Sequence, residues 1–276
     1  MNHPADFHIH PDYSIDARGS IIQYCRRAVE IGLKSICFTT HYDVNPRRTE
    51  LDGYWHYHNS RARISDKLIG IYLDEIETAL TNFPSAKLQI YRGLEVDYFP
   101  GVEREIERLK ANFPFDFLIG SVHCLDDIAI SDKREAPAYF NRKTLTQMTT
   151  DYFALLKMAA ESPGLDAIGH LDYYIRYYRE YYGADADRID IEQFDPIFDV
   201  LKRLNRGFEI NTSPFRYGLN NFHPNKKIIE RAVNSGVKIS SIGSDSHKPE
   251  KLALGVNEAY EFLNRIDIIP EFPKAE

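Results

Sequence analysis

The stretch Asp6-Phe7-His8-Ile9-His10 is a short, strand-like run that ends in ionisable residues, and it is the first of several such runs along the chain. Similar runs occupy residues 35–41, 88–98, 116–123, 166–170, 207–213 and 238–247. Short apolar runs bounded by polar residues are typical of buried β-strands. The sequence therefore predicts about seven strands.

Helical patterns lie between these runs. Apolar residues recur at helical spacing in residues 20–31, 60–81, 102–111, 144–160, 191–204, 225–235 and 249–265. Strands that alternate with helices of this length indicate parallel βαβ units and an α/β fold. The less regular stretches 42–59, 124–143 and 173–190 follow strand ends, where a barrel places its active-site loops. Because no Pro/Gly/Ser-rich linker interrupts the pattern, we expect residues 1–276 to form a single domain.

The composition excludes several classes of protein. Of the 276 residues, 43% are hydrophobic and 27% charged, which is unlike a disordered or fibrous chain. The 34 Lys and Arg residues and 41 Asp and Glu residues give a net charge of −7, which argues against a nucleic-acid partner. No run approaches the ~18 apolar residues of a membrane span. With three scattered cysteines and no apolar leader, we expect a cytoplasmic protein without signal peptide or disulfides, and its oligomeric state stays open.

Six histidines fall at the ends of predicted strands: His8, His10, His41, His123, His170 and His247. Two acidic residues, Glu95 and Asp245, share this placement. In a parallel barrel the carboxyl ends of the strands converge on one face, so these side chains can meet there. A lone His-x-His pair is weak evidence, because His56-Tyr57-His58 supplies a second one in a predicted loop.

A cluster of imidazoles and carboxylates suits Zn²⁺, Mn²⁺ or Fe²⁺. One such ion takes about four protein ligands, so a cluster of this size predicts two or three ions. Without metal, the same groups would leave unpaired charge in a partly buried place, which is unfavourable. The competing interpretation is that each histidine is an ordinary core or surface residue.

Five segments together carry a resemblance to a known family: residues 6–17, 93–98, 120–123, 169–172 and 243–250. They include Gly93-Leu94-Glu95, Gly120-Ser121-Val122-His123 and Gly243-Ser244-Asp245-Ser246-His247. The chain resembles the PHP (polymerase and histidinol phosphatase) superfamily from residue 6 to about residue 256, and it is most similar to the monofunctional histidinol-phosphatase branch. The resemblance implies a distorted seven-stranded (β/α)7 TIM-like barrel with a metal site at the carboxyl ends of its strands.

The resemblance also implies a ligand set for three metal ions. One ion would be held by His8, His10, Glu95 and Asp245, and Glu95 would bridge to a second ion held by His123 and His170. The third ion would be held by Asp16, His41 and His247. The family usually has an acidic residue before the second-strand histidine, where this chain has Thr40, and this difference affects the expected orientation of His41.

Two arginines fit phosphate binding because each matches an arginine found in the histidinol-phosphatase branch, and Arg179 is a close alternative to Arg176. Arg216 lies in an Asn-Thr-Ser-x-x-Arg stretch that starts at Asn211, and Arg176 follows His170 by six residues. A guanidinium group can bind phosphate through two parallel hydrogen bonds. We expect Glu209 to bond a buried neighbour, and we expect His223 to be a solvated loop residue.

The resemblance implies hydrolysis of L-histidinol phosphate to L-histidinol and phosphate, a step of histidine biosynthesis. Metal-activated hydroxide would attack the phosphorus. No catalytic residue is assigned beyond this metal centre, and the general acid for the leaving group is not identified. The candidates for recognition of the imidazole and amine of the substrate are Asp12, Tyr42, Asp97 and Tyr98.

Three alternatives stay open at the level of sequence. The first is a PHP-type phosphoesterase that acts on nucleotides or other small phosphate esters. The second is a non-catalytic, metal-dependent binding protein, because ligands can persist after activity is lost. The third is an amidohydrolase barrel, which also begins with His-x-His but usually has a carboxylated lysine late in the fourth strand, where this chain has Gly120-Ser121-Val122-His123.

Overall fold

The computed structural model describes residues 4–58 and 60–273. Its main sheet has seven strands in the order β1-β2-β5-β6-β9-β10-β11, and each neighbouring pair is parallel. The strands are β1 (Ala5–Ile9), β2 (Ser35–Tyr42), β5 (Gln89–Asp97), β6 (Phe117–Ser121), β9 (Ala167–Ile168), β10 (Gly207–Asn211) and β11 (Ile239–Gly243). Each lies within one of the seven predicted runs or extends it by one residue, which confirms the α/β prediction.

The sheet curls into a nearly closed barrel. The first and last strands meet through the segment after β11, where the His10 amide donates to the Ser246 carbonyl at 2.8 Å. The Ser246 amide in turn donates to the His8 carbonyl at 3.2 Å. The short β9 and this loose seam distort the barrel, as the resemblance implied. The expected seven-stranded TIM-like barrel is confirmed.

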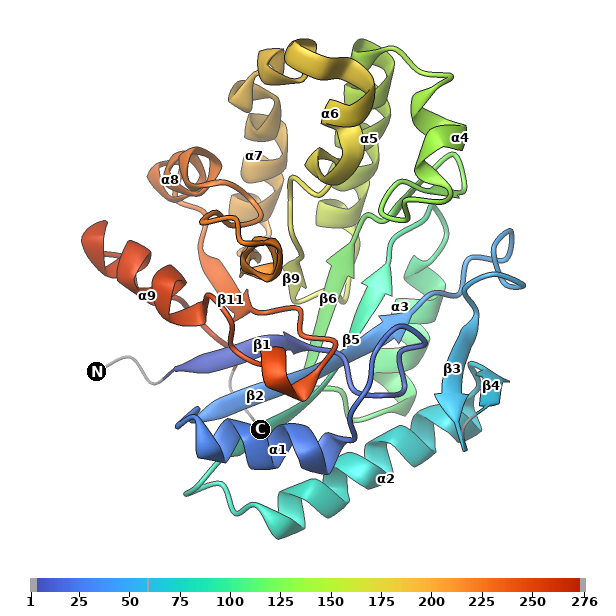
Figure 1. The fold of residues 1–276 in the computed structure, drawn as a ribbon, viewed down its shortest axis with the longest axis vertical. Helices are drawn as coiled ribbons and strands as arrows, with labels where there is room; N and C mark the ends of the chain where they lie inside the picture. Colours follow the sequence, from blue (N-terminus) through green and yellow to red (C-terminus); the bar gives the residue numbers. More distant parts are fainter. Residues whose placement is uncertain (1–3, 59, 274–276) are drawn as a thin grey trace.

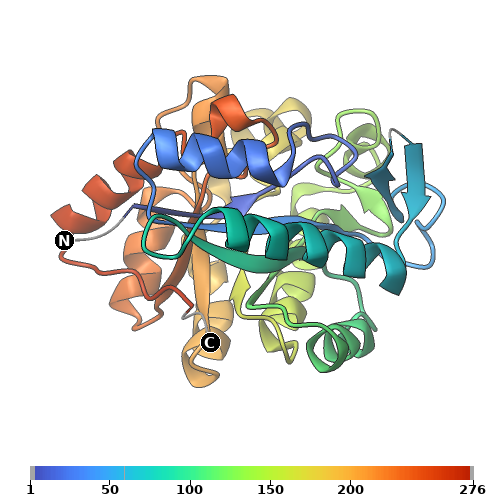
Figure 2. The same cartoon turned by 90° about the horizontal axis from the view of Figure 1, so that it is seen from below.

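Helices follow most of the strands and lie around the sheet (Figures 1 and 2). They are α1 (Ile21–Glu30), α2 (Asp66–Asn82), α3 (Glu103–Asn112), α4 (Ala136–Phe140), α5 (Leu145–Glu161), α6 (Ile175–Tyr182), α7 (Asp195–Arg203), α8 (Lys226–Asn234) and α9 (Val256–Arg265). Capping boxes at Ser20 and Thr144 fix the starts of α1 and α5. In the described part of the chain, no helix combines the length and apolar character that crossing a membrane requires.

Three helix predictions were too long at their amino-terminal ends. Residues 60–63 of the predicted helix 60–81 form a strand, and α2 begins only after Ser65, whose side chain accepts a hydrogen bond from the Leu68 amide. The predicted helix 191–204 begins as a 3-10 turn (Ile191–Phe194), and α7 starts at Asp195. The predicted helix 249–265 is interrupted by Gly255, whose φ of +83° lies in the left-handed region and separates a short turn from α9.

Two small hairpins lie within or beside the irregular stretches 42–59 and 124–143. β3 (Tyr54–Tyr57) pairs with β4 (Ser60–Arg63), and β7 (Cys124–Leu125) pairs with β8 (Ile128–Ala129), both antiparallel. Both hairpins extend the loops that follow barrel strands, β2 and β6 respectively. The loops therefore have ordered secondary structure of their own at the end of the barrel that was expected to carry the site.

The interior of the barrel changes from apolar to polar along the strands. Toward the amino ends of the strands, Phe7 packs against Tyr91 and Phe117 with ring centroids 4.8 and 5.8 Å apart, although β1 neighbours neither β5 nor β6. Alternation along β5 then places Glu95 on the same side as Tyr91. The pairing of β1 with β2 is irregular between Asp6 and Ile9, so that His8 as well as Phe7 faces inward. Toward the carboxyl ends, His8 and Glu95 thus face inward.

Close packing around Gly243 makes a prediction about stability. A Cβ atom on Gly243 would lie 2.2 Å from the His8 Cβ and 2.5 Å from Glu209 Oε1. We predict that Gly243→Ala lowers the free energy of unfolding by about 1–3 kcal/mol, because the strands must move apart. The matched control is Gly70→Ala in α2, where a Cβ meets nothing within 4 Å. Thermal unfolding should show this control stabilised by about 0.5–1 kcal/mol, and a neutral Gly243→Ala variant would contradict the packing argument.

Candidate metal centre

All of the side chains expected to bind metal lie at the carboxyl end of the barrel. They come from β1 and its extension (His8, His10, Asp16), β2 (His41), β5 (Glu95), the ends of β6 and β9 (His123, His170) and the segment after β11 (Asp245, His247). All but Asp16 are buried or half-buried, whereas the Asp16 side chain is 59% exposed. Residues from the two ends of the sequence thus meet in one cluster.

Glu95 lies at the centre of this cluster. Its Oε2 atom is 3.3 Å from His8 Nε2, 3.4 Å from His10 Nε2 and 3.0 Å from His41 Nδ1. Its Oε1 atom is 3.3 Å from His123 Nε2 and 3.0 Å from His170 Nε2. One carboxylate therefore faces five imidazoles, and each of its oxygens faces a different subset.

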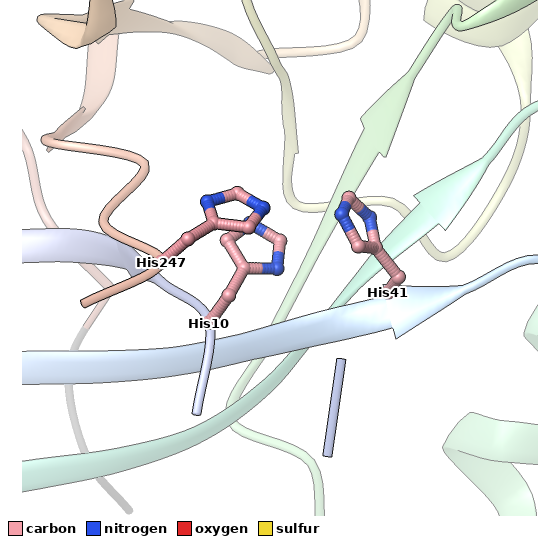
Figure 3. A group of neighbouring side chains, drawn as sticks. All are labelled: His10, His41 and His247. Carbon is pink, nitrogen blue, oxygen red and sulfur yellow. The ribbon is translucent and has the colours of Figure 1, made fainter. Parts of the chain in front are cut away.

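A second part of the cluster extends from His10 toward the segment after β11. The His10 ring lies between those of His247 and His41, with ring centroids 4.1 and 4.2 Å away (Figure 3). Asp245 Oδ1 is 3.4 Å from both His10 Nε2 and His247 Nδ1. Asp16 lies on the outer side, with its oxygens 3.2 Å from His247 Nε2 and 3.8 Å from His41 Nε2.

The donor atoms of the cluster fit divalent metal ions. His8 Nε2, His10 Nε2 and His41 Nδ1 are buried and have no hydrogen-bond partner, although each faces the Glu95 carboxylate. Buried polar atoms are normally paired, so this arrangement needs a further partner. These three nitrogens and the Glu95 Oε2 atom that they face without a hydrogen bond form a suitable donor set for Zn²⁺ or a similar ion.

The charge distribution holds His10 and Glu95 in the protonation states that metal binding requires. At His41 and His123 burial lowers the pKa, but the Glu95 carboxylate outweighs burial and raises the pKa to about 10 and about 9, so these two imidazoles would release a proton when a metal binds. Burial, together with the neighbouring rings of His247 and His41, holds the pKa of His10 well below its usual value, so its nitrogen lone pair is free. Burial alone would raise the pKa of Glu95, but the charges of His8 and His123 outweigh it and hold that pKa well below the usual range. Neutral imidazole and ionised carboxylate are the forms that coordinate metal.

Four overlapping sets of side chains within the described residues could each hold an ion, with their ligand atoms within 4.8 Å of one another. The sets are His8, His10 and Glu95; Glu95, His123 and His170; His10, His41 and His247; and His41, Asp43 and His123. The first set contains three of the four ligands expected for the first ion, without Asp245, and the second contains the three expected for the second ion. The third contains two of the expected ligands of the third ion, with His10 in the place of Asp16. Asp43 was not among the expected ligands.

Carboxylates and hydroxyls outside the cluster hold its ligands in place. Glu209, fully buried on β10, lies 2.6 Å from His8 Nδ1 and accepts a hydrogen bond from the His170 amide, so the expectation that it bonds a buried neighbour is confirmed. The Ser121 hydroxyl donates to Glu95 Oε1 at 2.6 Å. Such outer contacts fix the orientation and tautomer of metal ligands.

Thr40, which stands where the family usually has an acidic residue, joins this outer layer. Its hydroxyl lies 2.8 Å from the Ser14 hydroxyl. The Ser14 hydroxyl lies 3.2 Å from His10 Nδ1 and accepts a hydrogen bond from the His41 amide. Thr40 therefore contributes to the positions of both His10 and His41 through Ser14.

A cavity of about 860 Å³ opens onto the cluster. Its wall includes residues of the three irregular loops, which agrees with their expected place beside the site. Arg216 and Arg176 both line it. Arg216 donates to the Asp245 carbonyl and, at 3.2 Å, to Asp245 Oδ2, whereas Arg176 donates to the hydroxyls of Tyr173 and Tyr217.

His223 corrects one sequence-based expectation. It is buried, with 8% exposure, and its Nδ1 atom lies 2.7 Å from the fully buried carboxylate of Asp172. Reciprocal backbone hydrogen bonds with Asn211, both of 2.8 Å, draw the loop against β10 and bring the ring inward. The expectation of a solvated loop histidine is wrong, and only the neighbouring Pro224 and the strand-end position of Asp172 hinted at an ordered turn.

Of the residues considered for recognition of the imidazole and amine, only Asp97 lines the cavity. Its carboxylate accepts a hydrogen bond from the His123 amide at 3.0 Å, so it also positions a candidate ligand. The Tyr42 hydroxyl donates a hydrogen bond to Glu105 in α3, and the Tyr98 hydroxyl donates one to Glu103 at the start of α3. Asp43 was not among the residues selected from the sequence. Alternation along the strand nevertheless places it on the same side as His41, which precedes it by two residues.

Comparison with known proteins identifies the family. The sequence profile of the PHP domain matches residues 6–213, about three quarters of the chain. The chain belongs to the PHP domain family. The match spans the candidate ligands from His8 to His170, whereas Asp245 and His247 lie beyond it and join the cluster through the seam of the barrel.

Two relatives of this PHP protein are named as histidinol-phosphatases, one of them as a probable one. It is 28% identical to a probable histidinol-phosphatase of Deinococcus radiodurans, with 95% of this chain and 93% of the relative aligned. It is 26% identical to the histidinol-phosphatase of Lactococcus lactis, with 94% and 90% aligned. The crystal structure of histidinol phosphate phosphatase from Lactococcus lactis, complexed with zinc, L-histidinol and phosphate, superimposes with a TM-score of 0.77 at 23% identity and covers 98% of this chain and 95% of that one.

The contact between Glu209 and His8 generates a prediction about metal affinity. We predict that Glu209→Gln lowers the affinity of this PHP protein for Zn²⁺ by ~10- to 100-fold, because the amide holds the imidazole less strongly in the ligating tautomer. Competition with a chelator of known affinity measures the change. Glu250→Gln, at an exposed carboxylate paired with Arg18, is the matched control and should leave the affinity unchanged. Equal affinities in all three proteins would contradict the role assigned to Glu209.

Proposed function

We propose that this PHP protein is a metal-dependent phosphomonoesterase whose substrate is L-histidinol phosphate. The observation that carries the proposal is the convergence of five imidazoles on the Glu95 carboxylate at the base of a cavity that also contains two arginines. The names of the relatives support the choice of substrate. The activity would place the protein in histidine biosynthesis, as the sequence resemblance implied.

The proposed metal ligands are those of the sequence-based set. His8, His10, Glu95 and Asp245 would hold one ion, and Glu95 would contribute its other oxygen to a second ion with His123 and His170. His41, His247 and Asp16 would hold a third. Two or three ions of Zn²⁺, Mn²⁺ or Fe²⁺ fit this donor set, and zinc is present in the Lactococcus lactis structure. Bound divalent ions supply positive charge that lowers the pKa of water and neutralises phosphoryl oxygens.

The residues of the chain itself would bind and orient the phosphate. Arg216 is held against Asp245 by two contacts, so its guanidinium is fixed beside one of the proposed ligands. Among the described residues, the hydrogen bonds of Arg176 go to tyrosine hydroxyls and its guanidinium lies over tyrosine rings, so no carboxylate pairs with it and its charge is free to meet an anion. A phosphate between the two guanidinium groups would receive paired, charge-assisted hydrogen bonds. Both residues would stabilise the dianion in the ground state and as charge shifts toward the leaving oxygen.

A phosphate-release assay tests the proposal. We expect the purified protein, supplied with Zn²⁺ or Mn²⁺, to hydrolyse L-histidinol phosphate and to lose this activity on exhaustive chelation. His123→Ala should lower kcat/KM by at least ~100-fold, because it removes a proposed ligand. The matched control is His56→Ala, which alters the second His-x-His pair in β3, away from the cluster.

The outcomes separate the proposal from its rivals. Turnover that survives chelation, or that is undiminished in His123→Ala, would contradict the metal-dependent mechanism. A kcat/KM that is higher for nucleotides or sugar phosphates than for L-histidinol phosphate would favour a broader phosphoesterase, because specificity is a ratio of these values. Bound metal without hydrolysis of any phosphoester would favour a binding protein.

A further inference from the structure

Asp43 differs from the other carboxylates in the wall of the metal-site cavity. It follows β2, two residues after His41, and its Oδ1 atom is buried without a hydrogen-bond partner. Within the described residues its carboxylate forms no ion pair with Lys, Arg or His.

The remaining carboxylates of the wall are already paired. Away from the cluster, Asp52 and Glu135 bind Arg48, Asp132 binds Arg134, and Glu50 binds Arg63. Nearer the cluster, Asp97 is occupied by the His123 amide. The others belong to the proposed ligand set. Among the described residues that line the cavity, Asp43 is therefore the one carboxylate that has no ion pair and no place in the proposed ligand set.

Asp43 and Arg216 carry opposite charges and lie at opposite ends of a row of histidine rings. Arg216 contacts Asp245 and His247 at one end of the row of rings formed by His247, His10 and His41 (Figure 3). Asp43 lies at the other end, with its ligand atom within 4.8 Å of His41 and His123. A phosphate held by the arginines and a positive charge held by Asp43 would thus lie on opposite sides of the cluster.

We propose that Asp43 binds the primary ammonium group of the substrate and selects phosphate monoesters that carry such a cation. This inference rests on the proposed function. In L-histidinol phosphate the ammonium group is on the carbon next to the one that bears the phosphate ester, so one molecule can meet both ends of the cavity. Charge complementarity favours this occupant, because a buried carboxylate without a partner is unfavourable and an ammonium hydrogen bond compensates it.

A metal ion is the other cation that could lie beside Asp43. Both ring nitrogens of His41 already face carboxylates, Glu95 at 3.0 Å and Asp16 at 3.8 Å. Those of His123 likewise face Glu95 at 3.3 Å and Asp97 at 3.6 Å. Because three of these nitrogens are directed at proposed metal ligands and the fourth, His123 Nδ1, faces Asp97, Asp43 is left as a single oxygen ligand on the cavity side, which suits an ammonium group better than an additional ion.

A cycle of one substitution and one substrate change tests the proposal. The metal-loaded wild type and Asp43→Asn are assayed with L-histidinol phosphate and with its deaminated analogue, 3-(imidazol-4-yl)propyl phosphate. We expect Asp43→Asn to lower kcat/KM for L-histidinol phosphate by ~10- to 100-fold, mainly through KM, because a charge-assisted hydrogen bond is lost. The wild type should lose a similar factor on the analogue, and the two losses should not add.

Controls distinguish this proposal from the proposed function. Asp132→Asn lines the same cavity, but its carboxylate is paired with the exposed Arg134, so it should behave as the wild type. If Asp43→Asn loses a metal ion by elemental analysis, or slows both substrates equally, Asp43 acts through the metal and the proposal is overturned. Equal discrimination against the analogue in the wild type and in Asp43→Asn would also overturn it. Failure of the wild type to hydrolyse L-histidinol phosphate would instead overturn the proposed function.

Discussion

The structure depends on how the negative charge of one buried carboxylate, that of Glu95, is neutralised. Glu95 is almost fully buried at the end of β5 and faces five imidazoles, three of which have a ring nitrogen that is directed at it without a hydrogen bond. Protons alone compensate such a group poorly, because charged imidazoles packed together repel one another. Divalent cations between the carboxylate and neutral rings would neutralise the carboxylate without this repulsion. The seam of the barrel brings Asp245 and His247 beside His10, so that their side chains join the same cluster.

The barrel supports this arrangement by close packing on one side and hydrogen bonding on the other. Gly243 allows β11 to approach His8 so closely that no side chain fits between them. Glu209 then reaches the outer nitrogen of His8 and the amide of His170 from β10. The side chain of His8 and the main chain at His170 are therefore held by close packing and by a carboxylate outside the cluster. The loops supply the cavity wall, where Asp43, Arg176 and Arg216 set its charge.

Much of the fold and of the candidate site could be predicted from the sequence, because strand ends in a parallel barrel converge whatever their separation along the chain. From that rule the sequence predicted that His8, Glu95 and Asp245 lie close together. Local patterns failed where tertiary contacts decide the outcome. The apolar residues of the segment that begins at residue 60 recur at helical spacing, but residues 60–63 form strand β4, which pairs with β3. His223 is buried because its loop pairs with Asn211. The inference that residues 1–276 form a single domain stays a prediction.

The central claim is that cations bridge Glu95 and the surrounding imidazoles. Anomalous X-ray diffraction at the zinc absorption edge, from crystals grown with Zn²⁺, tests it most directly. The account predicts two or three peaks in the cluster, at least two of them within about 2.0–2.3 Å of a Glu95 carboxylate oxygen. A map that places zinc only elsewhere, or that shows Glu95 bound to protonated histidines alone, would contradict it.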